Sequence, residues 1–143
     1  MKKYVILLFL ICLSVQGFSQ DWITDINKAK ELASQNDKKI VLVFSGSDWC
    51  APCMKLDKSI FKTEDFQSFA TNNYIMLKAD FPRRKKNALS SELQKHNNLL
   101  AEKYNPRGFF PLVVVMDSSG NVLGETGYQK ISPNQFIELL ESF

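Results

Sequence analysis

The chain has 143 residues, 45% of them hydrophobic, and carries a formal net charge of +3. This length suits one ordinary domain that can bury a core of its own. Such a small net charge gives no electrostatic reason to expect a partner made of nucleic acid.

The first 19 residues have the pattern of a secretory signal peptide. A basic start precedes an apolar stretch at 4–15, and small residues stand before an expected cleavage site after Ser19. The apolar stretch is short for a membrane span, and a retained signal anchor is the alternative. We therefore expect residues 20–143 to form one exported, periplasmic domain that is monomeric and has no integral membrane span.

Removal of the signal peptide changes both the charge and the set of cysteines. Loss of Lys2 and Lys3 lowers the formal charge from +3 to +1, and Cys12 is lost with them. Cys50 and Cys53 then remain as one close pair. A single pair of cysteines does not indicate a fold that is held together by several disulfides. The presence of this pair is therefore to be explained by its chemistry.

Hydrophobic periodicity and turn residues divide residues 20–143 into helices and strands. Helices are predicted at 21–37, 51–61, 63–72, 91–104 and from Pro133 onward, after a Ser132 cap. Strands are predicted at 40–44, 74–79, 112–116 and 121–126. Early strands separated by helices favour parallel pairing, and the turn at 117–120 favours a late antiparallel hairpin. The order predicts an α/β fold with a central mixed sheet flanked by helices.

Cys50 and Cys53 stand at the predicted start of the 51–61 helix, after a strand and a turn of small residues. Cysteines three residues apart in a first helical turn are close enough for a disulfide. The helix dipole and the free N–H groups favour a thiolate at Cys50, which we expect to be the attacking nucleophile. Cys53 lies one turn further in and is expected to be the shielded, resolving thiol. Pro52 keeps this turn stiff.

Two structural interpretations compete with redox chemistry at this pair. A static disulfide over so short a loop constrains little of the unfolded chain. A zinc site needs about four ligands, whereas residues 20–143 offer these two cysteines and one distant histidine, His96. We therefore expect a redox pair with no bound metal and no cofactor.

The run 41–53 closely resembles the active-site region of thioredoxins. Residues 48–50, followed by 55–58 and Phe61, resemble the periplasmic thioredoxin-like branch, including the C-terminal domain of DsbD-type reductases. The resemblance covers residues 20–143 in element order and implies a three-layer thioredoxin-like sandwich. It also implies thiol–disulfide exchange with disulfide-containing protein substrates, driven by an upstream thiol reductant such as a membrane reductase.

The resemblance also implies a substrate platform around Pro111. Thioredoxins have a cis proline before the third strand, facing the cysteines. The cis form of a peptide bond costs little free energy only when proline follows it. Phe110-Pro111 is therefore expected to be cis, with backbone that pairs with the substrate chain; a trans proline starting an edge strand is the alternative. Phe110 is bulkier than the usual residue there. Trp49 is expected to cover the edge of the site, with core packing as the alternative, and Gly127 to flank the groove.

Thioredoxins carry a buried aspartate on the strand before the cysteines, and a direct alignment places Phe44 at that position. Asp57 is the candidate substitute, because it follows Cys53 by four residues on the same helix face. The DsbD-type domain has an acid at the same place. If partly buried, Asp57 could accept the proton of Cys53; alternatively it is a solvated acid paired with Lys58 or Lys62.

The remaining charged and linking residues refine this interpretation. Asp48 is expected to be a solvated turn residue or an N-cap, and the basic run 83–86 a solvated loop or a docking surface for an acidic partner or membrane. Ala51-Pro52 resembles the sequences of reductants.

The rival function is a thioredoxin-like binding module, or a module that passes electrons or a metal to one partner with little general turnover.

Overall fold

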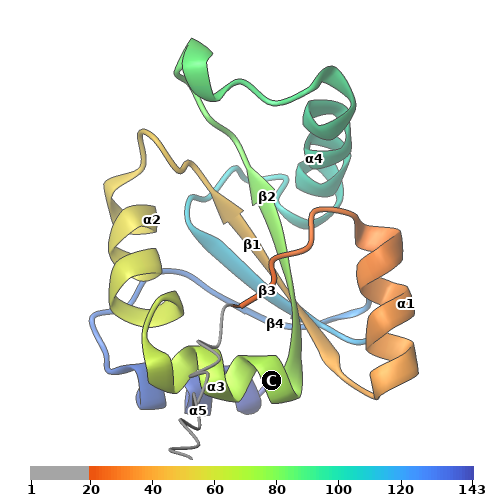
Figure 1. Cartoon of the computed structure of the whole chain (residues 1–143), viewed down its shortest axis with the longest axis vertical. Coiled ribbons are helices and arrows are strands. Elements are labelled where there is room, and N and C mark those ends of the chain that lie inside the picture. Colours follow the sequence, from red (N-terminus) through yellow and green to blue (C-terminus); the bar gives the residue numbers. More distant parts are fainter. Residues whose placement is uncertain (1–19) are drawn as a thin grey trace, which may run out of the picture.

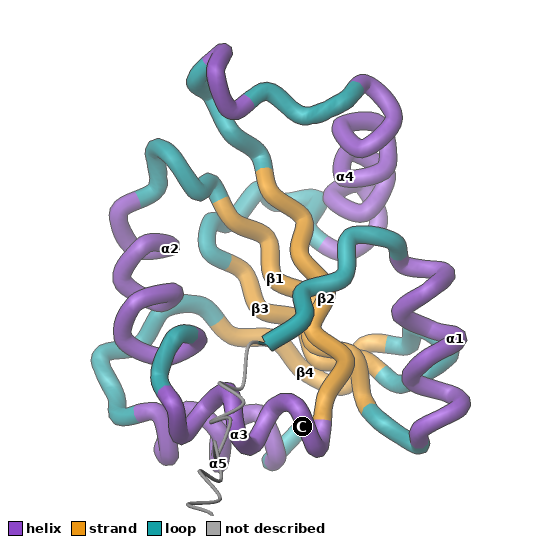
Figure 2. The backbone as a smooth tube through the Cα atoms, viewed as in Figure 1, coloured by secondary structure: helices purple, strands orange, loops and turns teal. Residues whose placement is uncertain are grey.

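The computed structural model describes residues 20–143, which form a sheet with helices on both faces (Figures 1 and 2). The expected signal peptide lies outside the described residues. Across the sheet the strands are β2 (Tyr74–Asp80), β1 (Lys39–Ser45), β3 (Leu112–Met116) and β4 (Val122–Thr126). β1 pairs with β2 in parallel and with β3 antiparallel, and β3 pairs antiparallel with β4. The predicted mixed sheet with a late hairpin is confirmed.

Two groups of helices cover the two faces of the sheet (Figure 1). One face carries α1 (Ile26–Asn36) and α4 (Ser91–Tyr104). The other carries α2 (Ala51–Leu56), α3 (Glu64–Asn73) and α5 (Pro133–Glu141). The molecule therefore has three layers, as expected. No helix within residues 20–143 is long and apolar enough to cross a membrane.

β1 separates two hydrophobic cores, because successive side chains of a strand point to opposite faces of the sheet. Val41 and Val43 are buried in the core beneath α2, α3 and α5. Ile40, Leu42 and Phe44 are buried in the core beneath α1 and α4. The near-continuous apolar sequence of this strand thus reflects burial on both faces.

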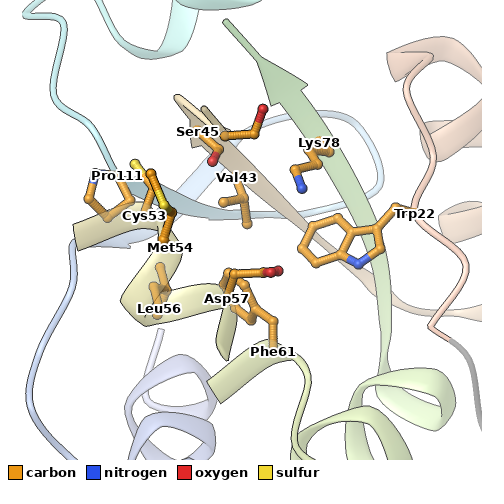
Figure 3. A pocket seen from close by; sticks show the side chains of 11 residues that line it. Trp22, Val43, Ser45, Cys53, Met54, Leu56, Asp57, Phe61, Lys78 and Pro111 are labelled. Carbon is orange, nitrogen blue, oxygen red and sulfur yellow. The ribbon is translucent and has the colours of Figure 1, made fainter. Parts of the chain in front are cut away.

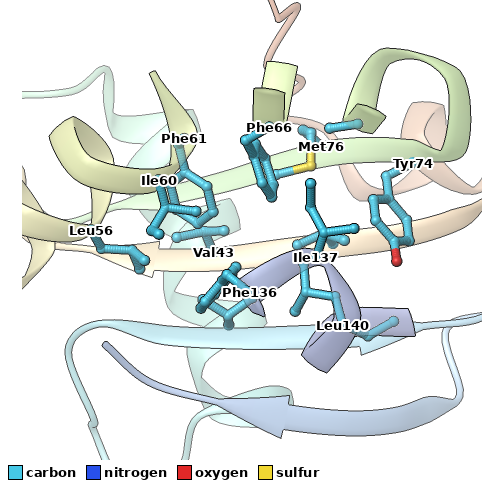
Figure 4. Close-up of a cluster of buried hydrophobic side chains, with 14 residues drawn as sticks. Val43, Leu56, Ile60, Phe61, Phe66, Tyr74, Met76, Phe136, Ile137 and Leu140 are labelled. Carbon is cyan, nitrogen blue, oxygen red and sulfur yellow. The ribbon is translucent and has the colours of Figure 1, made fainter. Parts of the chain in front are cut away.

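Three phenylalanine rings hold together the helical layer nearest the cysteines (Figure 4). The ring centroids of Phe61 and Phe66 lie 5.1 Å apart, and that of Phe136 lies 6.0 Å from Phe61. Phe136 reaches this position because α5 begins where predicted: the Ser132 hydroxyl accepts the N–H of Gln135, whose side chain accepts the Ser132 N–H.

The first helix is shorter than the predicted 21–37. Asp25 is its N-cap and accepts hydrogen bonds from the N–H groups of the first helical turn, so the helix begins at Ile26. Ile23 instead bridges to β2 in parallel, through hydrogen bonds to its backbone. Its partly buried side chain packs against the core from an extended segment rather than from a helix.

Two other segments also differ from the expected elements. The predicted helix 51–61 divides into α2 and a π-helical turn, η1 (Asp57–Phe61). The polar segment 81–90, which lies between the predicted strand 74–79 and helix 91–104, contains one short 3-10 turn, η2 (Lys85–Asn87).

Candidate active site

The two cysteines lie where the carboxyl end of β1 leads into α2. Cys50 is the N-cap of α2 and Cys53 lies in its first turn; they form a disulfide with Cα atoms 5.2 Å apart. Cys50 Sγ accepts the N–H of Cys53 at 3.3 Å. Cys50 is 4% and Cys53 3% exposed, so burial in this oxidised form does not tell them apart. Their positions distinguish the two cysteines, because only Cys50 stands at the positive end of the helix.

The bond between Phe110 and Pro111 is cis, as predicted. Pro111 lines the small cavity beside Cys53 (Figure 3) and also a groove of about 530 Å³. The groove extends past Pro52 and Phe109 to Gly127. A methyl group on Gly127 would come within 3.5 Å of the carbonyl oxygen of Pro111, an ordinary contact, so the fold does not require glycine there.

Trp49, which directly precedes Cys50, belongs to neither buried core. Its indole N–H donates to the carbonyl oxygen of Phe81 at 2.7 Å, and its ring meets Phe110 edge-on with centroids 5.4 Å apart. Gly46 lies beneath the ring, where a Cβ atom would overlap it. Trp49 thus joins the β1–α2 turn to the segment that carries the cis proline.

Phe44 does not occupy the place that the alignment gave it. Its side chain faces α1 and α4, where its ring stacks on Phe81 with centroids 6.5 Å apart. The β1 side chains that line the cavity beside Cys53 are Val43 and Ser45, because alternate residues share a face. The alignment was wrong about which residue faces the cysteines. The conclusion that the strand aspartate of thioredoxins is missing still holds, because the β1 side chains in that cavity include no acid.

Asp57 does line this cavity, which has a volume of about 50 Å³ (Figure 3). Its carboxylate points into the cavity on the side of Trp22 and Lys78, and it also pairs with Lys62 at 2.6 Å, with 30% of its side chain exposed. The geometry therefore contains elements of both interpretations of Asp57, as an ion-paired acid and as a group near Cys53. Its role as proton acceptor stays a prediction.

Sequence reasoning missed two residues on the opposite wall of the cavity, Lys78 of β2 and Trp22 (Figure 3). Lys78 Nζ lies 5.4 Å from the centroid of the Trp22 ring. Lys78 had a signal in the sequence, because it is the one charged residue within the predicted strand 74–79. Trp22 had none, since its position depends on an extended segment that was predicted to be helical.

The basic segment 81–88 is bound to the active-site turn through Asp48. The carboxylate accepts the N–H groups of Arg83 at 2.9 Å and Arg84 at 3.0 Å, and the side-chain amide of Asn87 at 2.9 Å. These hydrogen bonds, above all that from Arg83, lower the pKa of Asp48 to about 2. Asp48 is thus a turn residue, as expected, whose carboxylate accepts hydrogen bonds from a distant loop; the N-cap of α2 is Cys50.

His96 lies away from the cysteines, on the face covered by α1 and α4. Its Nε2 accepts the N–H of Ile26 at 3.3 Å. Within residues 20–143, no three His, Cys, Asp or Glu side chains gather in a group that could hold a metal ion.

A mixed sheet, a Cys-x-x-Cys pair at the start of the helix after β1, and a cis proline before β3 together define a protein of the thioredoxin fold. Residues 26–143 match the family model of the thioredoxin-like domain, so the chain belongs to this family.

Two curated relatives come from Chlamydia pneumoniae. Disulfide bond reductase DsbH is 35% identical over 102 residues, which cover 71% of this chain and 60% of the relative. Thioredoxin-related protein DsbJ is 22% identical over 83 residues, 58% of this chain and 23% of the relative. The chain thus spans less than two thirds of the length of either relative.

Solved structures show the same fold. One described as DsbH oxidoreductase is 29% identical, with a TM-score of 0.80 over 87% of this chain and 83% of that one. The oxidised C-terminal domain of DsbD from Neisseria meningitidis is 20% identical, with a TM-score of 0.59 over 85% and 98% of the two chains. The second likeness concerns the fold alone.

Proposed function

We propose that this protein is a thiol–disulfide oxidoreductase that reduces disulfides of client proteins outside the cytoplasm. The observation that carries the proposal is the Cys50–Cys53 pair at the start of α2, with Pro111 beside it at the head of an open groove. The 35% identity to a disulfide bond reductase supports it, as does the pattern of the first 19 residues.

The exchange begins with the reduced pair. The Cys50 thiolate attacks one sulfur of a client disulfide; a Cys50–client bond forms, and the other client sulfur leaves as a thiolate that takes a proton from water. The Cys53 thiolate then attacks Cys50 and releases the first client sulfur. The client gains two electrons, the protein is left with the Cys50–Cys53 disulfide, and an upstream thiol reductant returns the two electrons.

Cys53 must lose its proton before it can attack, and Asp57 is the group proposed to accept it. Both residues line the same small cavity, and the ion pair with Lys62 leaves most of the carboxylate sheltered from solvent. Because no β1 side chain in this cavity is acidic, Asp57 would take the part of the strand aspartate of thioredoxins.

Trp49, Phe110, Pro111 and Gly127 are proposed to hold the client chain. Pro111 and Gly127 line one groove beside the α2 residue Pro52, so an extended peptide lying there would pass close to the cysteines. The backbone next to Pro111 would pair with it in the manner of an added strand.

Substitution of each cysteine in turn tests the function. Cys53→Ser should accumulate mixed disulfides with client proteins through Cys50, because the resolving thiol is missing, and mass spectrometry would identify the linkage. Cys50→Ser is the matched control and should trap nothing and lose insulin reduction. The proposal fails if Cys53→Ser traps nothing while Cys50→Ser still reduces insulin. A binding module with an inactive cysteine pair would instead trap nothing and would reduce no insulin even as the wild type.

The direction of exchange follows from the reduction potential. Within this fold, potentials extend from roughly −270 mV for reductants to −120 mV for strong oxidants. The proposal as a reductase, which Ala51-Pro52 and the relative's printed activity favour, predicts a value near the reducing end. Equilibration with glutathione or dithiothreitol buffers measures it, and a value near the oxidising end would reverse the proposed direction.

A further inference from the structure

Four consecutive cations, Arg83 to Lys86, stand exposed in the loop between β2 and α4. Both salt bridges found within residues 20–143 lie elsewhere, at Lys62–Asp57 and Arg107–Glu125, so no acidic side chain is paired with these cations there. The formal charge of residues 20–143 is only +1. The other residues of 20–143 carry 12 cations and 15 acids, a net charge of −3, so net positive charge is concentrated in this loop.

The loop is held in place rather than merely solvated. Asp48 accepts three hydrogen bonds from it, and the indole of Trp49 donates to Phe81 at its base. A further backbone hydrogen bond joins Phe81 N–H to the carbonyl oxygen of Ser45 at 2.9 Å. The carboxylate of Asp48 offsets one of the four positive charges, and the loop keeps an excess of cations.

The fixed loop lies directly beside the proposed client platform. The guanidinium carbon of Arg83 stands 3.7 Å above the centroid of the Trp49 ring, and Trp49 meets Phe110 at 5.4 Å. Phe110 precedes Pro111 and lines the groove. A continuous series of contacts thus runs from the first cation of the loop to the groove beside the cysteines.

The groove itself offers no comparable charge. Among the described residues that line it, the one charged side chain is Glu125, which pairs with Arg107 at 3.0 Å. Among residues 20–143, the lining of the groove thus contains no cation that could attract acidic residues, and the basic loop is placed to supply that attraction.

We propose that residues 83–86 form a docking surface for an acidic stretch of the client chain, next to the client cysteine that Cys50 attacks. This inference rests on the proposed function and assigns it a substrate class: disulfide proteins with clustered Asp or Glu residues beside the reactive cysteine. A client protein is favoured over a lipid surface, because the cations adjoin Trp49 and the groove, where a flat membrane would obstruct access to the disulfide.

Two disulfide-bonded peptides that differ only in four flanking Glu or four flanking Gln residues test the proposal. The pre-reduced protein should react with the Glu peptide about five-fold faster at low salt, because complementary charges steer association. The difference should nearly vanish near 1 M salt, where the screening length is about 3 Å.

The test variant is Arg84→Gln/Lys85→Gln/Lys86→Gln, in which Arg83 keeps its contact with Trp49. It should bring the ratio of the two rate constants close to one. The matched control is Lys28→Gln/Lys95→Gln/Lys103→Gln, which removes the same charge from exposed positions of α1 and α4. This control should keep the wild-type ratio; if both variants lower it equally, overall charge is responsible and the loop proposal is overturned.

Binding of Cys→Ser versions of the two peptides, followed by fluorescence anisotropy, separates this proposal from the proposed function. Tighter binding of the Glu peptide, lost in the loop variant, supports the loop even if neither disulfide is reduced. Equal binding of both peptides overturns it and leaves the redox function standing. Equal peptide binding together with loop-dependent binding to phosphatidylserine vesicles would instead assign the loop to membranes.

Discussion

Asp57 is the residue whose proposed role depends most on its surroundings. The same carboxylate faces the cavity beside Cys53 and pairs with Lys62 on its exposed side. Asp57 and Cys53 line the same cavity, and we therefore propose Asp57 as the acceptor of the Cys53 proton.

We predict that Asp57→Asn slows the resolution of the mixed disulfide near neutral pH by about 10²-fold, the lower end of what a general base contributes. The rate should recover as the pH rises, because Cys53 then ionises without help. Rapid-quench measurement of client release from the Cys50 adduct across pH tests this. Lys62→Gln removes the ion pair but keeps the acid, and should remain close to wild type. Equal loss in both variants would assign Asp57 a structural role only.

Asp48 should hold the basic loop over almost the whole pH range. Hydrogen bonds from the loop favour its ionised form and set the pKa at about 2, below the roughly 3.9 of an unfolded aspartate. Their stabilising contribution is thus complete above about pH 4 and is lost as the pH falls through about 2.

The amide resonances of Arg83 and Arg84 report this titration directly. They should stay constant down to about pH 3 and move only as the pH approaches 2, in line with the lowered pKa of Asp48. In Asp48→Asn the acid transition of these two amides should be absent. A transition near pH 4 in the wild type that is lost in Asp48→Asn would contradict the prediction, because it would show that the loop does not lower the pKa of Asp48.

At the scale of elements, local sequence signals predicted most of the fold because their causes are local. The apolar run of β1, the Ser132 cap and Pro133 of α5 each act within a few residues, and each appears where expected. The start of α1 was wrong because Ile23 fits the period of a helix but forms backbone hydrogen bonds to β2. A distant strand overrode the local pattern there.

The candidate site was predictable to the same extent. The cysteine pair and the cis bond at Pro111 come from short motifs, and both are confirmed. The side of the sheet to which Phe44 points was not predictable. A turn of uncertain length shifts the alignment with thioredoxins by one residue, and a shift of one residue in a strand moves a side chain to the opposite face. The contact of Asp48 with Arg83 spans 35 residues of sequence, and no local pattern indicates it.

The β1–α2 turn is an element whose shape depends on one small residue. A methyl group on Gly46 would overlap the Trp49 ring, which is fixed by Phe81 on one side and lies beneath Arg83. Gly46→Ala should therefore displace the ring and cost about 1–3 kcal/mol in the free energy of unfolding, as overpacking usually does.

Gly108→Ala is the matched control for this turn. Gly108 has a φ of +69° with open space around it, so alanine there costs about 1–2 kcal/mol through conformation alone. Both variants should lower stability in urea, but only Gly46→Ala should alter the fluorescence of Trp49, read in a Trp22→Phe background. Unchanged Trp49 emission in Gly46→Ala would show that the ring does not rely on this close approach.

At the scale of the whole molecule, the aromatic residues that support the site differ from those that line the groove. α2, which bears the cysteines, lies over the core that contains Phe61, Phe66 and Phe136, and this core joins α2 to α3 and α5 (Figure 4). The groove lies at the surface, where Phe109 is 50% exposed. Stability and client binding should therefore respond to different aromatic residues.

We predict that Phe136→Ala lowers the free energy of unfolding by about 3–5 kcal/mol, because a fully buried ring is lost and a cavity remains. Phe109→Ala should change it by less than about 0.5 kcal/mol, since the side chain is half exposed, but should weaken binding of a client peptide in the groove. Urea unfolding and peptide titration of the two variants measure both effects. A large loss of stability in Phe109→Ala would contradict this separation, because it would make the groove part of the structural core.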